Sequence, residues 1–129
     1  MLKNLPDIIQ KVGFDFEWDN KKVWQLDVPM TKMDIKELIW HFEIPFCRNQ
    51  DDKYSLTPSE IIKNPEMHKI EYERTMKADM QHPLDIMENK GRWLILDGLH
   101  RLMKAYVQGQ KEVGVRVIPR DKISEILRT

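Results

Sequence analysis

Residues 93–109 limit the folds available to this chain more than any other segment does. An apolar run at 93–96 leads into Asp97 and Gly98, and a helical pattern begins at once with Leu99. A glycine between a strand and a helix permits a tight turn, and the first backbone N–H groups of the helix then point toward one spot. The helix dipole adds partial positive charge there, so the segment predicts an anion site.

His100 and Arg101 fall in the first turn of this expected helix. Arginine offers a rigid fork of donors that matches phosphate oxygens, and histidine can donate a hydrogen bond or a proton. Cations at a helix N-terminus oppose the dipole unless an anion lies nearby. The pattern therefore indicates a small phosphate cradle. The alternative is that Asp97 caps the helix and that both cations are solvated.

A longer pattern surrounds this turn. It runs through a proline-led strand, a second apolar strand, the turn, a helix with a closing glycine, and a last strand: Pro83-Leu84-Asp85-Ile86, Trp93–Leu96, Asp97-Gly98-Leu99-His100-Arg101, Leu102–Gln108 with Gly109, and Val113–Ile118. With these pieces, the region 83–119 resembles the ParB/sulfiredoxin superfamily. The resemblance covers the last third of the chain and fades toward the N-terminus. It implies a ParB/sulfiredoxin-like fold.

In this superfamily the corresponding turn binds the phosphates of ATP, ADP or CTP. The resemblance implies that four residues meet a phosphate: Gly98, Leu99 through its N–H, His100 and Arg101. The implied partner is a nucleotide with Mg²⁺, or another phosphorylated small molecule. Sulfiredoxins carry a reactive cysteine directly before the His-Arg pair. This chain has Leu99 there, so sulfinic-acid reduction is excluded.

A nucleotide-dependent reaction also needs a base or a metal ligand near the phosphate. Superfamily members often present an acidic or polar residue from the helices before the proline-led strand, which makes Glu71 the first candidate and His68 the second. These two residues share one face of an expected helix at 66–78. Asp97 is a further candidate, because a carboxylate beside the turn can bind Mg²⁺ or accept a proton. The alternatives are helix capping for Asp97 and a solvated charged face for the other two.

Three functions are compatible with the resemblance. The first is a small nucleotide-dependent phosphotransferase or hydrolase. The second is a non-catalytic nucleotide-sensing or DNA-associated accessory protein related to ParB partition proteins. The third is a ParB-like nuclease, which is disfavoured because the sequence offers no convincing cluster of acidic metal ligands. The fold hosts several activities, so the family alone does not decide among them.

Composition fits a single domain spanning residues 1–129, which is long enough to bury a core. One cysteine suits a reducing compartment, and no apolar run approaches the roughly 20 residues that span a bilayer. We therefore expect a cytoplasmic protein without a membrane segment.

The charged residues are balanced overall but unevenly distributed. The chain has 21 lysines and arginines and 21 acidic residues, whereas residues 90–129 hold 9 lysines and arginines and 4 acidic residues. This distribution favours a phosphorylated ligand over duplex DNA. The sequence leaves open whether DNA is also a partner and which oligomeric state the protein adopts.

Local patterns predict an α+β fold, a small mixed sheet with helices packed around it. In the first half we expect a helix at Pro6–Val12 capped near Asn4 or Leu5, followed by a hairpin of Phe14–Trp18 and Val23–Val28. A second helix is expected to begin at a capping box, Thr31–Asp34, and to run through Phe42. Asn49–Tyr54 is expected to be a surface loop. In the second half we expect helices at Pro58–Lys63, Glu66–Ala78 and Asp121–Leu127, and a hairpin turn at Asn89–Gly91.

Several residues with reactive side chains are expected to be structural. Cys47 follows Phe46 and is predicted to be a small core residue, and His41 lies on an apolar helix as a hydrogen-bonded histidine. The four histidines lack the spacing of a zinc site, and there is no second cysteine, so no metal site is predicted. All four tryptophans are candidates for the core: Trp18, Trp24, Trp40 and Trp93.

Overall fold

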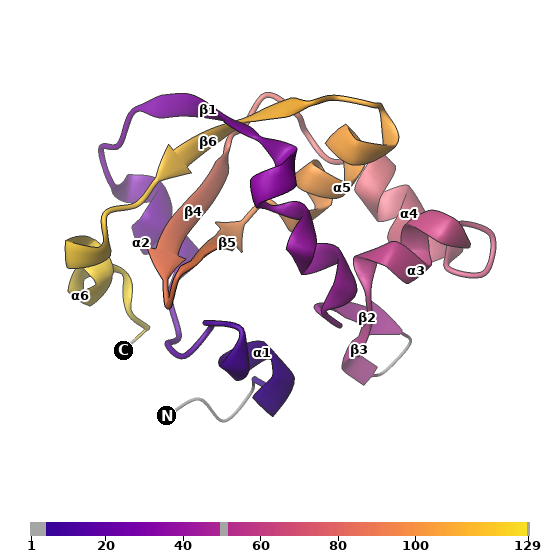
Figure 1. Cartoon of the computed structure of the whole chain (residues 1–129), viewed down its shortest axis with the longest axis horizontal. Helices are drawn as coiled ribbons and strands as arrows, with labels where there is room; N and C mark the ends of the chain where they lie inside the picture. Colours follow the sequence, from indigo (N-terminus) through magenta and orange to yellow (C-terminus); the bar gives the residue numbers. More distant parts are fainter. Residues whose placement is uncertain (1–4, 50–51, 129) are drawn as a thin grey trace.

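A four-stranded mixed sheet organises the molecule (Figure 1). The computed structural model describes residues 5–49 and 52–128. The sheet has the order β1-β6-β4-β5, formed by Met30–Asp34, Glu112–Val117, Leu84–Asn89 and Arg92–Asp97. β4 and β5 form an antiparallel hairpin, β6 runs parallel to β4, and β1 closes the other edge antiparallel to β6. The prediction of an α+β domain with a small mixed sheet is confirmed.

The helix α5, Leu99–Val107, connects β5 to β6 and thereby makes the parallel pairing of β4 and β6 possible. The described residues contain five further α-helices and a separate two-stranded sheet: α1 (Asp7–Lys11), α2 (Asn20–Gln25), α3 (Pro58–Lys63), α4 (Lys69–Met76), α6 (Ile123–Ile126), β2 (Cys47–Asn49) and β3 (Asp52–Leu56). Three short 3-10 helices complete the set: Ile35–Glu37, Ile39–Glu43 and Arg120–Lys122.

Residues of β4 and β5 alternate between two hydrophobic clusters, as the two-residue period of a strand requires. Ile86 and Ile95 belong to the cluster under α5, whereas Met87, Leu94 and Leu96 belong to the cluster that contains residues of α1, α2 and α6. Both faces of β4 and β5 are therefore covered. In Figure 1, α3, α4 and α5 lie together at one end of the molecule, and α2 and α6 lie at the other.

The second half follows the sequence predictions closely. The predicted helix at Pro58–Lys63 is α3, and it begins with a capping box. The Thr57 hydroxyl accepts from the Glu60 N–H, and the Glu60 carboxylate accepts from the Thr57 N–H. The β4–β5 hairpin turns at Lys90 and Gly91, both with positive φ. The helix expected at Glu66–Ala78 forms as the shorter α4, which begins at Lys69 and ends at Met76. The last predicted helix is divided into a 3-10 turn and α6.

Two predictions in the first half are wrong. The expected hairpin of Phe14–Trp18 and Val23–Val28 does not form. In the first segment only Trp18 makes an isolated bridge, to Leu127. The second segment overlaps α2, because the Asp19 carboxylate caps a helix by accepting from the Lys21 N–H. The expected helix at Thr31–Phe42 begins instead as the edge strand β1, and the Asp34 carboxylate then caps a 3-10 helix. β1 is nearly all exposed, so it lacks an apolar alternation in the sequence, and its pairing with β6 holds it in place.

Other first-half predictions are confirmed or corrected in detail. α1 forms within the predicted Pro6–Val12, with Pro6 as its N-cap, and the proposed cap at Asn4 lies outside the described residues. Asn49–Tyr54 is not a loop throughout, since it overlaps both strands of the β2–β3 hairpin; positions 50 and 51 are outside the described residues. Trp24 is 54% exposed and is not a core residue. No helix in the described ranges is long and apolar enough to cross a membrane.

Candidate functional site

The turn between β5 and α5 depends on Gly98. This residue is the N-cap of α5 and has φ +112° and ψ +17°, a left-handed conformation that favours glycine. A Cβ placed on Gly98 would lie 2.9 Å from Leu84 Cγ and 3.3 Å from Arg101 Cζ. Both the backbone conformation and the close packing therefore require glycine here, and they set the direction in which α5 begins.

The first turn of α5 leaves its backbone donors free. Leu102 N–H donates to the carbonyl of Gly98, which is the first hydrogen bond of the helix. Among the residues that the structure describes, the N–H groups of Leu99, His100 and Arg101 have no hydrogen-bond acceptor. The Asp97 carboxylate does not cap the helix, so the predicted capping role of Asp97 is wrong. These three amides are available to an anion.

Arg101 is held by protein atoms on two sides. Its Nη1 donates to the carbonyl oxygen of Pro83 at 2.7 Å, and its Nη2 donates to Asp97 Oδ2 at 3.1 Å. Asp97 Oδ2 also accepts from Nε1 of Trp24 at 2.8 Å. The guanidinium therefore ties the turn to the start of β4, and Asp97 ties it to α2. These contacts position the residues that surround the turn.

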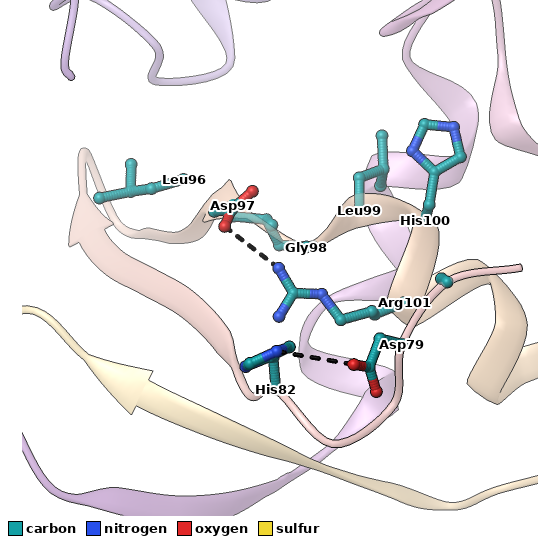
Figure 2. Close-up of a pocket in the computed structure, with 10 residues that line it drawn as sticks. Asp79, His82, Leu96, Asp97, Gly98, Leu99, His100 and Arg101 are labelled. Atoms are coloured by element: carbon teal, nitrogen blue, oxygen red, sulfur yellow. Dashed lines mark hydrogen bonds and ion pairs between the residues drawn. The ribbon is translucent and has the colours of Figure 1, made fainter. Parts of the chain in front are cut away.

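His100 points away from Arg101, as Figure 2 shows. Its Nε2 lies 3.6 Å from Glu71 Oε1 on α4. Successive residues of an α-helix are rotated by about 100°, so neighbouring side chains leave the helix in different directions. The predicted convergence of the His100 imidazole and the Arg101 guanidinium on one phosphate is therefore not found. In contrast, the structure brings His100 together with Glu71, which was a separate candidate.

A third group completes this cluster. Cys47 Sγ, a carboxylate oxygen of Glu71 and a ring nitrogen of His100 all lie within 4.8 Å of one another. The residues come from β2, α4 and α5, so no spacing motif in the sequence connects them. Burial raises the pKa of the Cys47 thiol to about 12, and the thiol is therefore no nucleophile at neutral pH. Cys47 is a buried core residue as predicted, but sequence reasoning missed its neighbours.

His100 Nε2 is a buried atom without a hydrogen-bond partner in the described part of the chain. Burial lowers the pKa of His100, and the nearby Arg74 guanidinium lowers it further, whereas Glu71 raises it. We therefore describe the imidazole as neutral at pH 7. Its contact with Glu71 is then a close approach of polar atoms rather than an ion pair.

His41 shows the opposite arrangement. Its Nδ1 lies 2.7 Å from the carbonyl oxygen of Leu38, and its Nε2 accepts from the N–H of Ile95 at 3.1 Å. Both ring nitrogens are thus satisfied, with the proton on Nδ1. Burial lowers the pKa of His41 to about 4. The prediction that His41 is a structural histidine is confirmed.

Two adjoining cavities open beside the turn. The first, about 450 Å³, is lined by the turn and by the segment that precedes β4: Ala78, Asp79, His82 and residues 95–101 (Figure 2). The second, about 490 Å³, shares His82, Asp97 and Arg101 with the first and extends to Trp24. Each volume lies within the range of small-molecule sites, roughly 300–1,000 Å³.

The floor of the second cavity contains a buried ion pair. Arg116 Nε lies 3.3 Å from Asp85 Oδ1, and its Nη2 donates to the carbonyls of Val23 and Leu26. Asp85 is only 3% exposed, and burial raises its pKa although Arg116 opposes the shift. This pair links β4 to β6 and to α2, and it positions the wall that carries Trp24.

The remaining sequence candidate, His68, lies apart from the turn. It is the N-cap residue of α4 and lines a third cavity of about 330 Å³ together with Glu71. Only Glu71, of these two, belongs to the cluster with His100. The structure thus brings together Gly98, Leu99, Arg101 and Asp97 around one cavity, and the side chains of His100 and Glu71 around a separate cluster.

Comparisons with known proteins add no assignment: no family model matches the sequence, and neither the curated proteins nor the solved structures contain a significant match.

Proposed function

We propose that this protein binds a nucleotide, with a phosphate group held against the first turn of α5. The observation that carries the proposal is the set of free N–H groups on Leu99, His100 and Arg101, next to a cavity of about 450 Å³. Backbone donors and the helix dipole together favour a bound anion. The His100 contribution is therefore its backbone N–H rather than its imidazole.

Trp24 supplies a platform for the base. Trp24 is 54% exposed and lines the second cavity, which shares His82, Asp97 and Arg101 with the first. Asp97 fixes the indole through the hydrogen bond to Nε1. Every nucleobase has a π-face, and stacking on an aromatic side chain contributes about 1–3 kcal/mol per base. A phosphate at α5 and a base at Trp24 would occupy both cavities.

The residues present are compatible with a Mg²⁺–nucleotide complex. Asp79 and Asp97 carboxylates line the first cavity, and carboxylate oxygens are ligands that Mg²⁺ uses. The cation would offset the repulsion between these carboxylates and a polyphosphate. Arg101 already neutralises Asp97 through their 3.1 Å contact. ATP, ADP and CTP are therefore the ligands to test first.

The proposal includes the ParB/sulfiredoxin-like fold. It is supported by the order of β4, β5, the Gly98 turn, α5 and β6, which is the order of that superfamily's signature. Turnover by a phosphotransferase or hydrolase stays a prediction. Of the three candidate bases only Asp97 lines the first cavity, whereas Glu71 and His68 line a different one. Release of phosphate or ADP distinguishes turnover from the second candidate function, a non-catalytic nucleotide sensor.

Calorimetric titration of the protein with ATP, ADP and CTP, each with Mg²⁺, tests the proposal. We expect binding of at least one nucleotide and weaker binding of pyrophosphate, which lacks the base. Trp24→Ala is expected to weaken nucleotide binding about tenfold and to leave pyrophosphate binding unchanged. Trp24→Phe retains a ring and separates stacking from the hydrogen bond to Asp97.

Tyr106→Ala is the matched control, since Tyr106 is also a partly exposed aromatic residue, at 45%, but lines neither cavity. It is expected to bind nucleotides like the wild type. Absence of binding by all three nucleotides and by pyrophosphate would contradict the proposal. If Trp24→Ala and Tyr106→Ala bound nucleotide with equal affinity, stacking of the base on Trp24 would be contradicted.

A further inference from the structure

We propose that Cys47 Sγ, one carboxylate oxygen of Glu71 and His100 Nε2 together bind a single divalent transition-metal ion, with Zn²⁺ as the best fit. The three atoms already lie within 4.8 Å of one another. Ligand atoms around a tetrahedral zinc ion are roughly 3.5 Å apart, given bonds of about 2.0–2.3 Å. A side-chain movement of about 1 Å would therefore complete the ligand set.

The unsatisfied nitrogen of His100 is an independent observation that points to a ligand. Buried polar atoms are nearly always hydrogen-bonded, and one that is not requires an explanation. His100 Nε2 is buried, has no partner among residues 5–49 and 52–128, and lies 3.6 Å from Glu71 Oε1. A metal ion between them would satisfy the nitrogen and balance the charge of the carboxylate.

The donor set identifies the class of metal. A thiolate, an imidazole and a carboxylate are the three side-chain ligands of zinc in proteins, whereas Mg²⁺ prefers oxygen ligands alone. The ligands come from β2, α4 and α5, so the ion would connect the packed helix pair α4–α5 to the two-stranded sheet. This is a separate site from the proposed nucleotide site, which uses the backbone of the same turn and Trp24.

Three protein ligands leave a fourth position for water. Glu71 lines the cavity of about 330 Å³ that also contains Arg48 and His68, so solvent reaches this side of the cluster. Zinc sites with three protein ligands and one open position are typical of sites that perform chemistry, and sites with four protein ligands are structural. The geometry therefore points to an ion with an exchangeable ligand.

Titration of the reduced full chain with Co²⁺, without any nucleotide, tests this proposal directly. The chain contains one cysteine, so any thiolate-to-cobalt charge-transfer absorption in the near ultraviolet reports Cys47. We expect this absorption together with the visible bands of tetrahedral Co²⁺, saturating at one ion per chain. Equimolar Zn²⁺ is expected to remove both signals. Cys47→Ser is expected to abolish the charge-transfer absorption, and Glu71→Gln and His100→Gln are each expected to weaken Co²⁺ binding more than tenfold.

His82→Gln is the control, because the His82 side chain is 71% exposed and lies outside the cluster. It is expected to bind Co²⁺ like the wild type. Folded wild-type protein that shows no thiolate absorption with excess Co²⁺ overturns the proposal, whatever the variants do. The proposal is equally overturned if Glu71→Gln and His100→Gln, verified as folded by circular dichroism, retain wild-type affinity. Failure of nucleotide binding alone affects only the proposed function.

Discussion

The surroundings of His41 and of His100 differ although both imidazoles are largely buried and both have a lowered pKa. His41 lies between Leu38 and Ile95 with both nitrogens hydrogen-bonded. His100 lies at the first turn of α5, where its Nε2 and three backbone N–H groups lack partners among the described residues. Burial and a shifted pKa are thus shared by a structural histidine and by a site candidate. The proposals for the turn rest instead on its unsatisfied polar groups.

The largest expected effect is on stability at His41. His41→Ala removes two buried hydrogen bonds and a packed ring, so the free energy of unfolding should fall by about 3–4 kcal/mol. His100→Ala removes packing but no hydrogen bond of Nε2, so the free energy of unfolding should fall by only about 1–2 kcal/mol. Urea denaturation of both variants measures the difference. Equal losses would show that the two environments are energetically alike.

Acid sensitivity sharpens the same comparison. The pKa of His41 is about 6.5 in the unfolded chain and about 4 in the folded protein, so the unfolded state binds the proton first as the pH falls. Stability is therefore lost between about pH 6.5 and 4, by up to about 3 kcal/mol. Replacing His41 with glutamine should flatten the pH dependence of the urea midpoint in this window. An unchanged slope would place the titrating group elsewhere.

The Gly98 turn is the next test, because it sets where α5 begins. Gly98→Ala should destabilise the protein by about 1–3 kcal/mol, through the left-handed φ and the 2.9 Å approach to Leu84. Gly91→Ala is a matched control, because Gly91 has φ +79° but no atom lies within 4 Å of the added Cβ. Its loss of stability should come only from the left-handed backbone conformation. Thermal denaturation should rank Gly98→Ala as the less stable variant. The reverse order would mean that the turn can shift to accept a side chain.

The smallest effect is expected at Arg101. Arg101→Lys loses the fork that joins Pro83 and Asp97, which should cost about 1 kcal/mol of unfolding free energy. Lys122→Gln breaks only the exposed contact with Glu125 and should cost less than about 0.5 kcal/mol. Chemical denaturation that finds no difference between the two variants would show that Arg101 does not anchor the turn.

Sequence patterns were sufficient where structure depends on neighbouring residues. Short apolar runs, glycine positions and helical spacing predict the β4–β5 hairpin, the Gly98 turn and α5, and all three form. β1 was missed because its residues are exposed and its strand conformation depends on pairing with the distant β6.

In the candidate site, too, the sequence predicts what depends on neighbouring residues and misses what depends on long-range packing. Gly98, Leu99 and Arg101 were placed at the turn by local sequence, and Glu71 was proposed from the resemblance. The proximity of Cys47 to Glu71 and His100 depends on the packing of β2, α4 and α5, which no spacing records. The divergence of the His100 and Arg101 side chains follows from the rotation of about 100° per residue in an α-helix, so it is predictable from the sequence.

The backbone amides of the first turn of α5 provide the most direct test of the account. Nuclear magnetic resonance of ¹⁵N-labelled protein, titrated with Mg²⁺ and the nucleotide that binds best, reports each N–H separately. We expect the amide signals of Leu99, His100 and Arg101 to shift most and to saturate together, while the amide of Leu38, which is buried beside His41 and lines neither cavity, changes little. Saturable binding with the largest shifts elsewhere, or no shift at these three amides, would contradict it.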